Sequence, residues 1–370
     1  MPVTLPLRGH NGNIRDKYSK NYNKLRIFVN INLQFIRYIM KLRNIHLLLA
    51  SLLLIFATCC TTLEAPSSGI SKELAAERRA TISNVEYDLD FHIPHSQDER
   101  VTGELTLRFH LKQLCAVTLD IRDVELTSAT ILLNGQPADY TLTAEHITLS
   151  PKSLREGENT LHLGFISSNQ SLNRNEEYLY TLLVPDRART LFPCFDQPDM
   201  KATYRLSLLI PEEWTAVSNT PITAYHEGDE GFKTIDFAPT EPLSTYLFSF
   251  VAGKLQSATY DDGTHRFTAY HRETDPKRIA QLDTIFKEIK YSLEWLEEYT
   301  AIDYPFAKYD LIMLPGFQYG GMEHTGATLY NASQMFLGDN PTLDELLRRS
   351  SVIAHETAHM WFGDYVTMRW

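Results

Sequence analysis

The sequence predicts an α+β protein, with an antiparallel β-domain followed by a second domain that is rich in helices. In residues 85–91 every second side chain is apolar, which is the pattern of a half-buried strand. From about Asp275 onward the apolar residues recur every three or four positions, as they do on one face of a helix. This change of period divides the folded chain into residues 81–270 and residues 271–370.

Charge is distributed unevenly along the chain. The sequence has 35 Lys and Arg and 46 Asp and Glu, yet its first 60 residues hold nine of the basic residues and one of the acidic ones. The rest of the chain is therefore acidic enough to repel a phosphate backbone, which excludes nucleic acid as a partner. With 43% hydrophobic and 22% charged residues, the composition is that of a globular protein.

The basic segment leads into the pattern of a secretory signal peptide at residues 40–60. Lys41 and Arg43 precede an apolar run of 13 residues from Ile45 to Ala57. This run is shorter than the roughly 20 apolar residues that a transmembrane helix needs. A buried core helix is the alternative. Residues 1–39 are interpreted as an upstream extension without a structural role.

Two adjacent cysteines follow the apolar run. Residues 56–58 resemble a lipoprotein processing site, which indicates a lipid on Cys59 or Cys60. We therefore expect an exported protein of the periplasm, the outer membrane or the cell surface, with membrane attachment through that lipid. Residues 61–80 are predicted to be a linker between this segment and the fold.

Further patterns support a β-domain in residues 81–270. Asn134-Gly135 is a strong signal for a hairpin turn. Apart from the pair near the signal segment, the chain contains two cysteines, Cys115 and Cys194, which are too few for a disulfide framework or a cysteine-rich metal site. A metal would therefore be held by histidines and carboxylates. Further strands are predicted at residues 105–111, 117–121, 130–133, 204–210 and 246–251.

The most specific motif lies in the last predicted helix. Thr342 and Glu345 form a capping box at its start, and Gly363 is placed to end it. In the middle of this helix the sequence reads His355-Glu356-Thr357-Ala358-His359. The two histidines lie one turn apart on the same helix face, where they can bind one zinc ion.

Glu356 follows the first of these histidines, so its carboxylate can take a proton from a zinc-activated water that attacks a peptide carbonyl. A chance pattern with two surface histidines is the alternative. Phe362 occupies the position where the metzincin pattern requires glycine, and no histidine follows His359, which excludes that clan. The third zinc ligand would then be a carboxylate from a later helix.

A second motif stands 31 residues before His355 and reads Gly320-Gly321-Met322-Glu323-His324. It resembles the Gly-x-Met-Glu-Asn signature of the aminopeptidase N family of zinc metallopeptidases, in the gluzincin clan. That family lays its glycine backbone along the substrate and uses the Glu to bind the free α-amine. The resemblance implies that Glu323 anchors this amine, with Gly320, Gly321, Met322 and His324 beside the substrate.

Other segments resemble the same family. Residues 192–202, Phe-Pro-Cys-Phe-Asp-Gln-Pro-Asp-Met-Lys-Ala, are similar to its Pro-Cys-x-Asp-Glu-Pro-x-x-Lys-Ala segment, and residues 243–247 and 360–370 also match. The resemblance covers about residues 80–370. It implies a saddle-like β-domain followed by the start of a thermolysin-like zinc peptidase domain. Cys194 is interpreted as a packed thiol and not as a nucleophile.

The sequence departs from the family pattern in three places. His324 replaces the usual Asn, which predicts a different and pH-sensitive substrate-binding edge. Leu182 falls near a position where many relatives carry a polar residue that helps to hold the amine. The family's third zinc ligand is a Glu about nineteen positions beyond the second His, whereas 11 residues follow His359. We therefore expect an incomplete, truncated catalytic domain without its third ligand, inactive or unstable alone.

The leading hypothesis is a zinc-dependent aminopeptidase that releases N-terminal amino acids from peptides, with one zinc ion as cofactor. Its substrates would be peptides with a free N-terminus. One alternative is a catalytically dead surface lipoprotein built on the β-domain. Another is a different zinc hydrolase on the same scaffold, such as an epoxide hydrolase.

Overall fold

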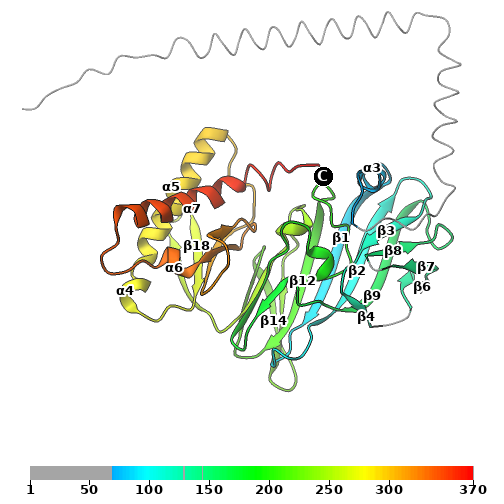
Figure 1. Cartoon of the computed structure of the whole chain (residues 1–370), viewed down its shortest axis with the longest axis horizontal. Helices are drawn as coiled ribbons and strands as arrows, with labels where there is room; N and C mark the ends of the chain where they lie inside the picture. The colour runs from blue at the N-terminus through cyan, green and yellow to red at the C-terminus, as the bar shows by residue number, and fades with distance from the viewer. Residues whose placement is uncertain (1–68, 128–129, 144, 370) are drawn as a thin grey trace, which may run out of the picture. The chain divides into compact units, whose positions relative to one another are not determined.

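The computed structural model describes residues 69–127, 130–143 and 145–369 (Figure 1). The predicted upstream extension, the signal peptide at residues 40–60, and both Cys59 and Cys60 lie outside the described residues. Among the helices of the described part, none is long and apolar enough to span a bilayer.

The first described helix, α3 (Lys72–Thr81), lies inside the segment that was predicted to be a linker. Ser71 caps it, because the Ser71 hydroxyl accepts a hydrogen bond from the backbone N–H of Leu74 at 3.1 Å. Arg78 points inward and is 2% exposed. The linker prediction is therefore wrong from Lys72 onward, because a buried cation and a capped start give this segment a place in the fold.

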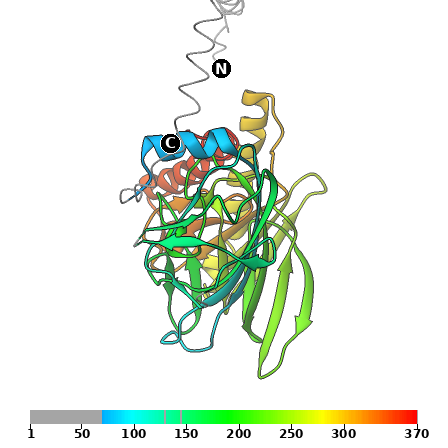
Figure 2. The ribbon, with the colours of Figure 1, turned by 90° about the vertical axis from the view of Figure 1, so that its right-hand side faces the viewer.

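The β-domain is built around a large sheet whose described strands follow the order β14-β15-β12-β1-β2-β9-β5-β6, with β4 also paired to β9. Figure 2 shows its long strands running side by side. The strands are β1 (Ile82–His92), β2 (Thr102–Leu111), β4 (Glu125–Leu126), β5 (Leu132–Leu133), β6 (Gln136–Pro137), β9 (Gly157–Ile166), β12 (Ala202–Pro211), β14 (Ile222–Glu227) and β15 (Phe232–Phe237).

Most neighbours in this sheet are antiparallel, as predicted, but β1 and β12 run parallel, with Tyr87 opposite Tyr204. The alternation of apolar residues could not show this, because it gives the buried face of a strand and not its direction. The predicted hairpin is confirmed: Asn134 and Gly135 both have positive φ, at 54° and 77°, between β5 and β6.

Two smaller sheets complete the β-domain. Their strands are β3 (Val117–Asp120), β7 (Tyr140–Leu142) and β8 (His146–Leu149) in one, and β10 (Leu172–Arg174), β11 (Tyr178–Thr181), β13 (Thr215–Ser218) and β16 (Phe250–Gly253) in the other. The strand predicted at residues 246–251 begins instead as a short 3₁₀ helix, η2 (Thr245–Leu247). A second one, η1 (Ala188–Thr190), precedes the segment 192–202.

The second domain contains a five-stranded sheet, in the order β17-β18-β19-β21-β20 among the described strands. They are β17 (Gln256–Asp261), β18 (Arg266–His271), β19 (Tyr309–Leu314), β20 (Gly321–Met322) and β21 (Thr328–Asn331). The predicted boundary at residue 270 is therefore about fifteen residues too late, because β17 pairs with β18, and β18 pairs with β19 and not with the β-domain. Apolar and polar residues alternate in β17 and β18 as in the strands of the β-domain, so this pattern could not show to which sheet they belong.

Helices pack on this sheet: α4 (Pro276–Ile279), α5 (Leu282–Thr300), α6 (Ala332–Met335) and α7 (Leu343–His359). Helices α5 and α7, yellow and red in Figure 1, share a core with β18 and β19. The predicted capping box of α7 is confirmed, with Thr342 and Glu345 each bonded to the other's backbone. The helix ends at His359 and not near Gly363, so the two histidines lie in its last turns.

The Arg78 guanidinium joins α3 to the rest of the β-domain through a buried ion pair. It donates to both carboxylate oxygens of Asp120, at 2.7 and 2.8 Å, and Asp120 is fully buried. Burial alone would raise the pKa of Asp120, but the charge of Arg78 and the hydrogen bonds to the carboxylate together outweigh this effect, so the pKa is lowered. A buried carboxylate that lost this partner would have to be protonated or resolvated.

We expect Arg78→Met to lower the free energy of unfolding by about 3–5 kcal/mol, because it leaves the Asp120 charge buried without its cation. Urea unfolding followed by circular dichroism measures this. Arg348→Met is the matched control, since Arg348 and its partner Asp344 are 66% and 82% exposed and such a pair contributes about 0–1 kcal/mol. Equal effects of the two substitutions would contradict the structural role of the buried pair.

Candidate metal and substrate site

The last two turns of α7 bring the predicted zinc ligands together. The Nε2 atoms of His355 and His359 lie 3.2 Å apart, and their ring centroids lie 4.7 Å apart. His355 is exposed and His359 is half-buried. Both rings therefore direct the same nitrogen at one point beside the helix, as the spacing of the motif predicted.

This geometry fits zinc. Two imidazole nitrogens bound to one tetrahedral zinc ion at about 2.0–2.1 Å would lie about 3.3 Å from each other. The observed Nε2 separation of 3.2 Å needs almost no adjustment to reach that value. The other ring nitrogen of His359, Nδ1, lies 3.2 Å from the carbonyl oxygen of Phe362. An imidazole that donates Nδ1–H to a carbonyl keeps Nε2 free for a metal.

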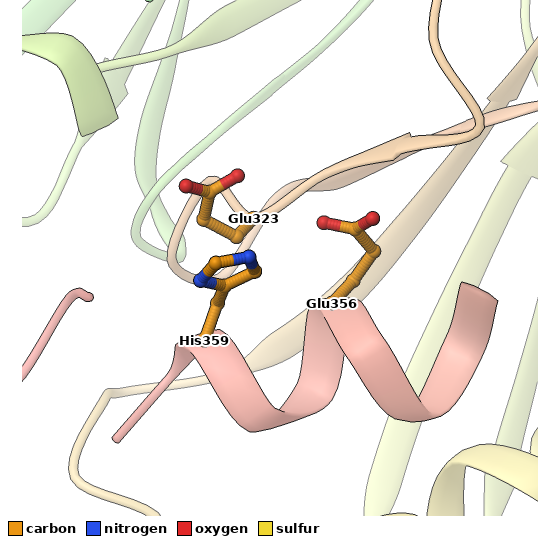
Figure 3. Close-up of side chains that lie close together, drawn as sticks. All are labelled: Glu323, Glu356 and His359. Atoms are coloured by element: carbon orange, nitrogen blue, oxygen red, sulfur yellow. The ribbon is translucent and has the colours of Figure 1, made fainter. Parts of the chain in front are cut away.

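Two carboxylates adjoin one member of the histidine pair, His359. Side-chain ligand atoms of Glu323, Glu356 and His359 all lie within 4.8 Å of one another. Figure 3 shows Glu356 and His359 rising from α7 toward Glu323, which comes from the loop after β20. The structure thus brings together residues that are separated by more than thirty positions in the sequence, as the two motifs predicted.

Glu356 is 5% exposed, although Glu323 is half-buried. Burial, and then the neighbouring charge of Glu323, raise the pKa of Glu356 to about 8. A cation between these carboxylates would offset their repulsion and favour the ionised form of Glu356. The donor set of imidazole and carboxylate is one that zinc accepts.

Strand β20 explains why the motif begins with glycines. A Cβ atom on Gly321 would lie 2.4–2.5 Å from Cγ, Cδ and Oε1 of Glu356, which is too close for any side chain. Gly321 therefore allows the Glu356 side chain to lie against the backbone of β20. This strand is the last in the order of its sheet, so its outer edge has no strand partner among the described residues.

Two predicted substrate-binding residues do not reach the surface. Met322 is 3% exposed and packs in the core of the β-domain. His324 is fully buried, and burial lowers its pKa to about 3. The structure therefore contradicts the prediction that His324 forms a pH-sensitive edge of the substrate site, because its ring is neutral and inaccessible.

Cys194 and Leu182 both lie in the core of the β-domain. Cys194 is fully buried, and burial raises its pKa, which agrees with a packed thiol. Leu182 is 1% exposed and belongs to the β-domain core.

The sequence analysis gave no role to two residues near the site. Asp364 is 1% exposed, and burial followed by the charge of Glu323 raises its pKa well above the usual range. Lys201 donates hydrogen bonds from Nζ to the carbonyl oxygens of Asp364 at 2.6 Å and Tyr365 at 3.0 Å. Lys201 lies in the segment 192–202, whose similarity to the family segment was the one sequence feature that pointed to it.

Comparison with known protein families gives two matches. The family model described as the Peptidase M1 N-terminal domain matches residues 83–247, which hold the large sheet. The model described as the Peptidase family M1 domain matches residues 285–370, which hold both site motifs. The two matches follow each other along the chain, as the two domains of the structure do.

Curated relatives agree with these matches. The chain is 29% identical over 321 residues to aminopeptidase N of Streptomyces lividans, a match that covers 82% of this chain and 36% of the relative. It is 33% identical over 188 residues to glutamyl aminopeptidase of Sus scrofa, covering 50% of this chain and 20% of the relative. The human glutamyl aminopeptidase is 32% identical over 188 residues, covering 50% and 19%. The matches thus span about a third or less of these relatives.

We expect His359→Ala to weaken zinc binding by the chain at least about tenfold, because it removes one of two imidazole ligands. Competition with a chromophoric chelator measures the dissociation constant. His226→Ala is the control, since His226 is 60% exposed and pairs with Asp236 at 2.9 Å in the β-domain. Unchanged zinc affinity in His359→Ala would show that the metal binds elsewhere.

Proposed function

Because this chain belongs to peptidase family M1, we propose that it provides the metal-binding and amine-binding residues of a zinc-dependent aminopeptidase. Its substrates would be peptides with a free N-terminus, and its product a single amino acid. The observation that carries the proposal is the approach of Glu323 to within 4.8 Å of both Glu356 and His359. A carboxylate in this place can hold an ammonium group next to a hydrolytic centre.

The residues divide the reaction between them. Zinc held by His355 and His359 would polarise the scissile carbonyl and lower the pKa of an attacking water. Glu356 lies beside that position and accepts the proton of the water, which it can then give to the leaving amine. Because Glu356 is buried against Gly321, its carboxylate has little freedom to turn away from the site.

Glu323 determines which peptide bond is cleaved. Its carboxylate pairs with the ammonium group of the first residue, and this places the first peptide bond at the zinc position. The open edge of β20 can add an extended peptide by backbone hydrogen bonds, as sheet edges do in other peptide-binding proteins. An N-acetylated peptide lacks the ammonium group and would leave Glu323 without its partner.

Three features of the sequence analysis stay predictions: a third zinc ligand about nineteen positions beyond His359, export through residues 40–60, and a lipid on Cys59 or Cys60. The positions of the two histidines and two carboxylates described above do not depend on the two predictions about residues 40–60, whereas a complete zinc site needs the third ligand as well.

We expect Glu356→Gln to lower the turnover of an alanyl-peptide at least about 100-fold, because it removes the proton acceptor. Since the match covers 36% of aminopeptidase N of Streptomyces lividans, turnover is measured on this chain fused to the remainder of that protein. Zinc affinity is measured on the same fusion and should stay within about threefold.

Glu323→Gln in the same fusion should reduce the preference for free over N-acetylated peptides, because the neutral amide no longer pairs with the ammonium group. A fusion that binds zinc but releases no amino acid, or that cleaves both peptides equally well, would contradict the aminopeptidase proposal.

Gly321→Ala should lower turnover at least about tenfold, because the new methyl group would occupy the space of the Glu356 side chain. Gly338→Ala is the matched control, since a Cβ there meets no atom within 4 Å. Steady-state kinetics of the two variants measure the difference. Equal turnover would mean that Glu356 does not need its place against β20.

A further inference from the structure

The loop that follows α7 is tied to the last turn of the helix. Backbone N–H groups of Asp364, Tyr365 and Val366 donate to the carbonyl oxygens of His359, Met360 and Trp361, at 3.0, 3.1 and 3.2 Å. A shift of this loop would therefore also move the backbone of His359, to which Asp364 is hydrogen-bonded. The same loop begins after Phe362, whose carbonyl oxygen lies beside Nδ1 of His359.

The β-domain holds this loop through two side chains. Lys201 donates to the carbonyl oxygens of Asp364 and Tyr365. Tyr246 donates its hydroxyl hydrogen to the carbonyl oxygen of Gly363 at 3.4 Å, a longer and weaker contact. An ammonium group is well suited to bind two carbonyl oxygens, because it has three N–H groups that can donate.

The Lys201 ammonium is committed to these carbonyls. Burial lowers the pKa of Lys201, and the nearby Asp364 carboxylate partly offsets this by favouring the charged form. Both carboxylate oxygens of Asp364 are buried without a hydrogen-bond partner in the described part of the chain. Lys201 is thus the cation that faces an otherwise acidic region formed by Asp364, Glu323 and Glu356.

The segment that carries Lys201 is hydrogen-bonded to the segment that carries Tyr246. Thr245 donates to the Asp196 carboxylate at 2.9 Å, and Ser244 donates to the carbonyl oxygen of Pro198 at 2.6 Å. These bonds tie the segment 192–202 to the segment 243–247, which carries Tyr246. Both segments were singled out in the sequence, and the proposed reaction uses neither of them.

We propose that Lys201 is a positioning residue for the metal site: by binding the carbonyls that follow α7, it fixes the loop that orients His359. The inference rests on the proposed function, because it assigns His359 to a metal. Lys201 belongs to the β-domain and His359 to the second domain. Through this contact the β-domain helps to orient a metal ligand of the second domain. Tyr246 assists from the same side.

Lys201→Met removes the donor and keeps the length of the side chain, whereas Lys201→Arg keeps a cationic donor. In the 370-residue chain, we expect Lys201→Met to weaken zinc binding about 10- to 100-fold, the range for residues that orient metal ligands. Lys201→Arg should recover most of this loss. Lys152→Met, at an exposed turn of the β-domain, serves as the control.

Hydrogen exchange of the zinc-free chain supplies a readout that needs no metal. In Lys201→Met, the amides of Asp364, Tyr365 and Val366 should exchange at least about tenfold faster, because their loop has lost its hold. Amides of β1, β2 and β12 should be unaffected. Zinc affinity equal to the wild type, unchanged exchange in the loop, or faster exchange throughout the β-domain would each overturn the proposal.

The two proposals fail in different ways. If the wild-type fusion used for turnover does not bind zinc, or binds it with the same affinity as the His359→Ala fusion, the proposed function is wrong, whatever Lys201 does. If the wild type binds zinc through His359 and Lys201→Met binds it equally well, the metal site stands and the positioning role of Lys201 falls.

Discussion

The buried carboxylate of Asp120 is the point on which the N-terminal part of this structure depends. Arg78 reaches it from α3, and the backbone N–H of Asp196 donates to its Oδ2 at 2.8 Å. The backbone of Asp120 also pairs with that of Cys194 in both directions. A buried charge is costly without partners, so α3, β3 and the segment 192–202 depend on one another for their packing around Asp120. That segment also contains Lys201, so the contacts of Asp120 help to fix the backbone that carries the Lys201 side chain.

The site in the second domain has the opposite electrostatic character. Burial, and then the repulsion between its carboxylates, raise the pKa of Glu356 to about 8 and that of Asp364 well above its usual range. An apolar core could not explain why three acids gather beside two histidines. The arrangement is reasonable for a site that receives two cations, a metal ion at the imidazoles and a substrate ammonium at Glu323. Each charge that enters would relieve a repulsion already built into the fold.

Much of this site could be predicted from the sequence because its main part is local. The spacing of His355 and His359 fixes their common face once the helix is known, and the capping box at Thr342 and Glu345 makes that helix evident. The burial of His324 could not be predicted, because a residue next to a half-buried glutamate of the site can still point into the core. The direction of β12 and the sheet to which β18 belongs depend on pairing between distant segments, which apolar alternation does not record.

Lys201 illustrates the same limit from the side of function. It lies 163 positions before Asp364, and no pattern around it predicts a contact with the end of α7. Its own surroundings in the sequence, with Asp196 and Asp199 close by, would instead suggest a local ion pair. The structure gives Asp196 to Thr245 and to Arg189, and gives Asp199 to Arg79. With the nearby acids already bonded elsewhere, the ammonium of Lys201 is free to bind the carbonyl groups that follow His359, and it adds one contact between the two domains.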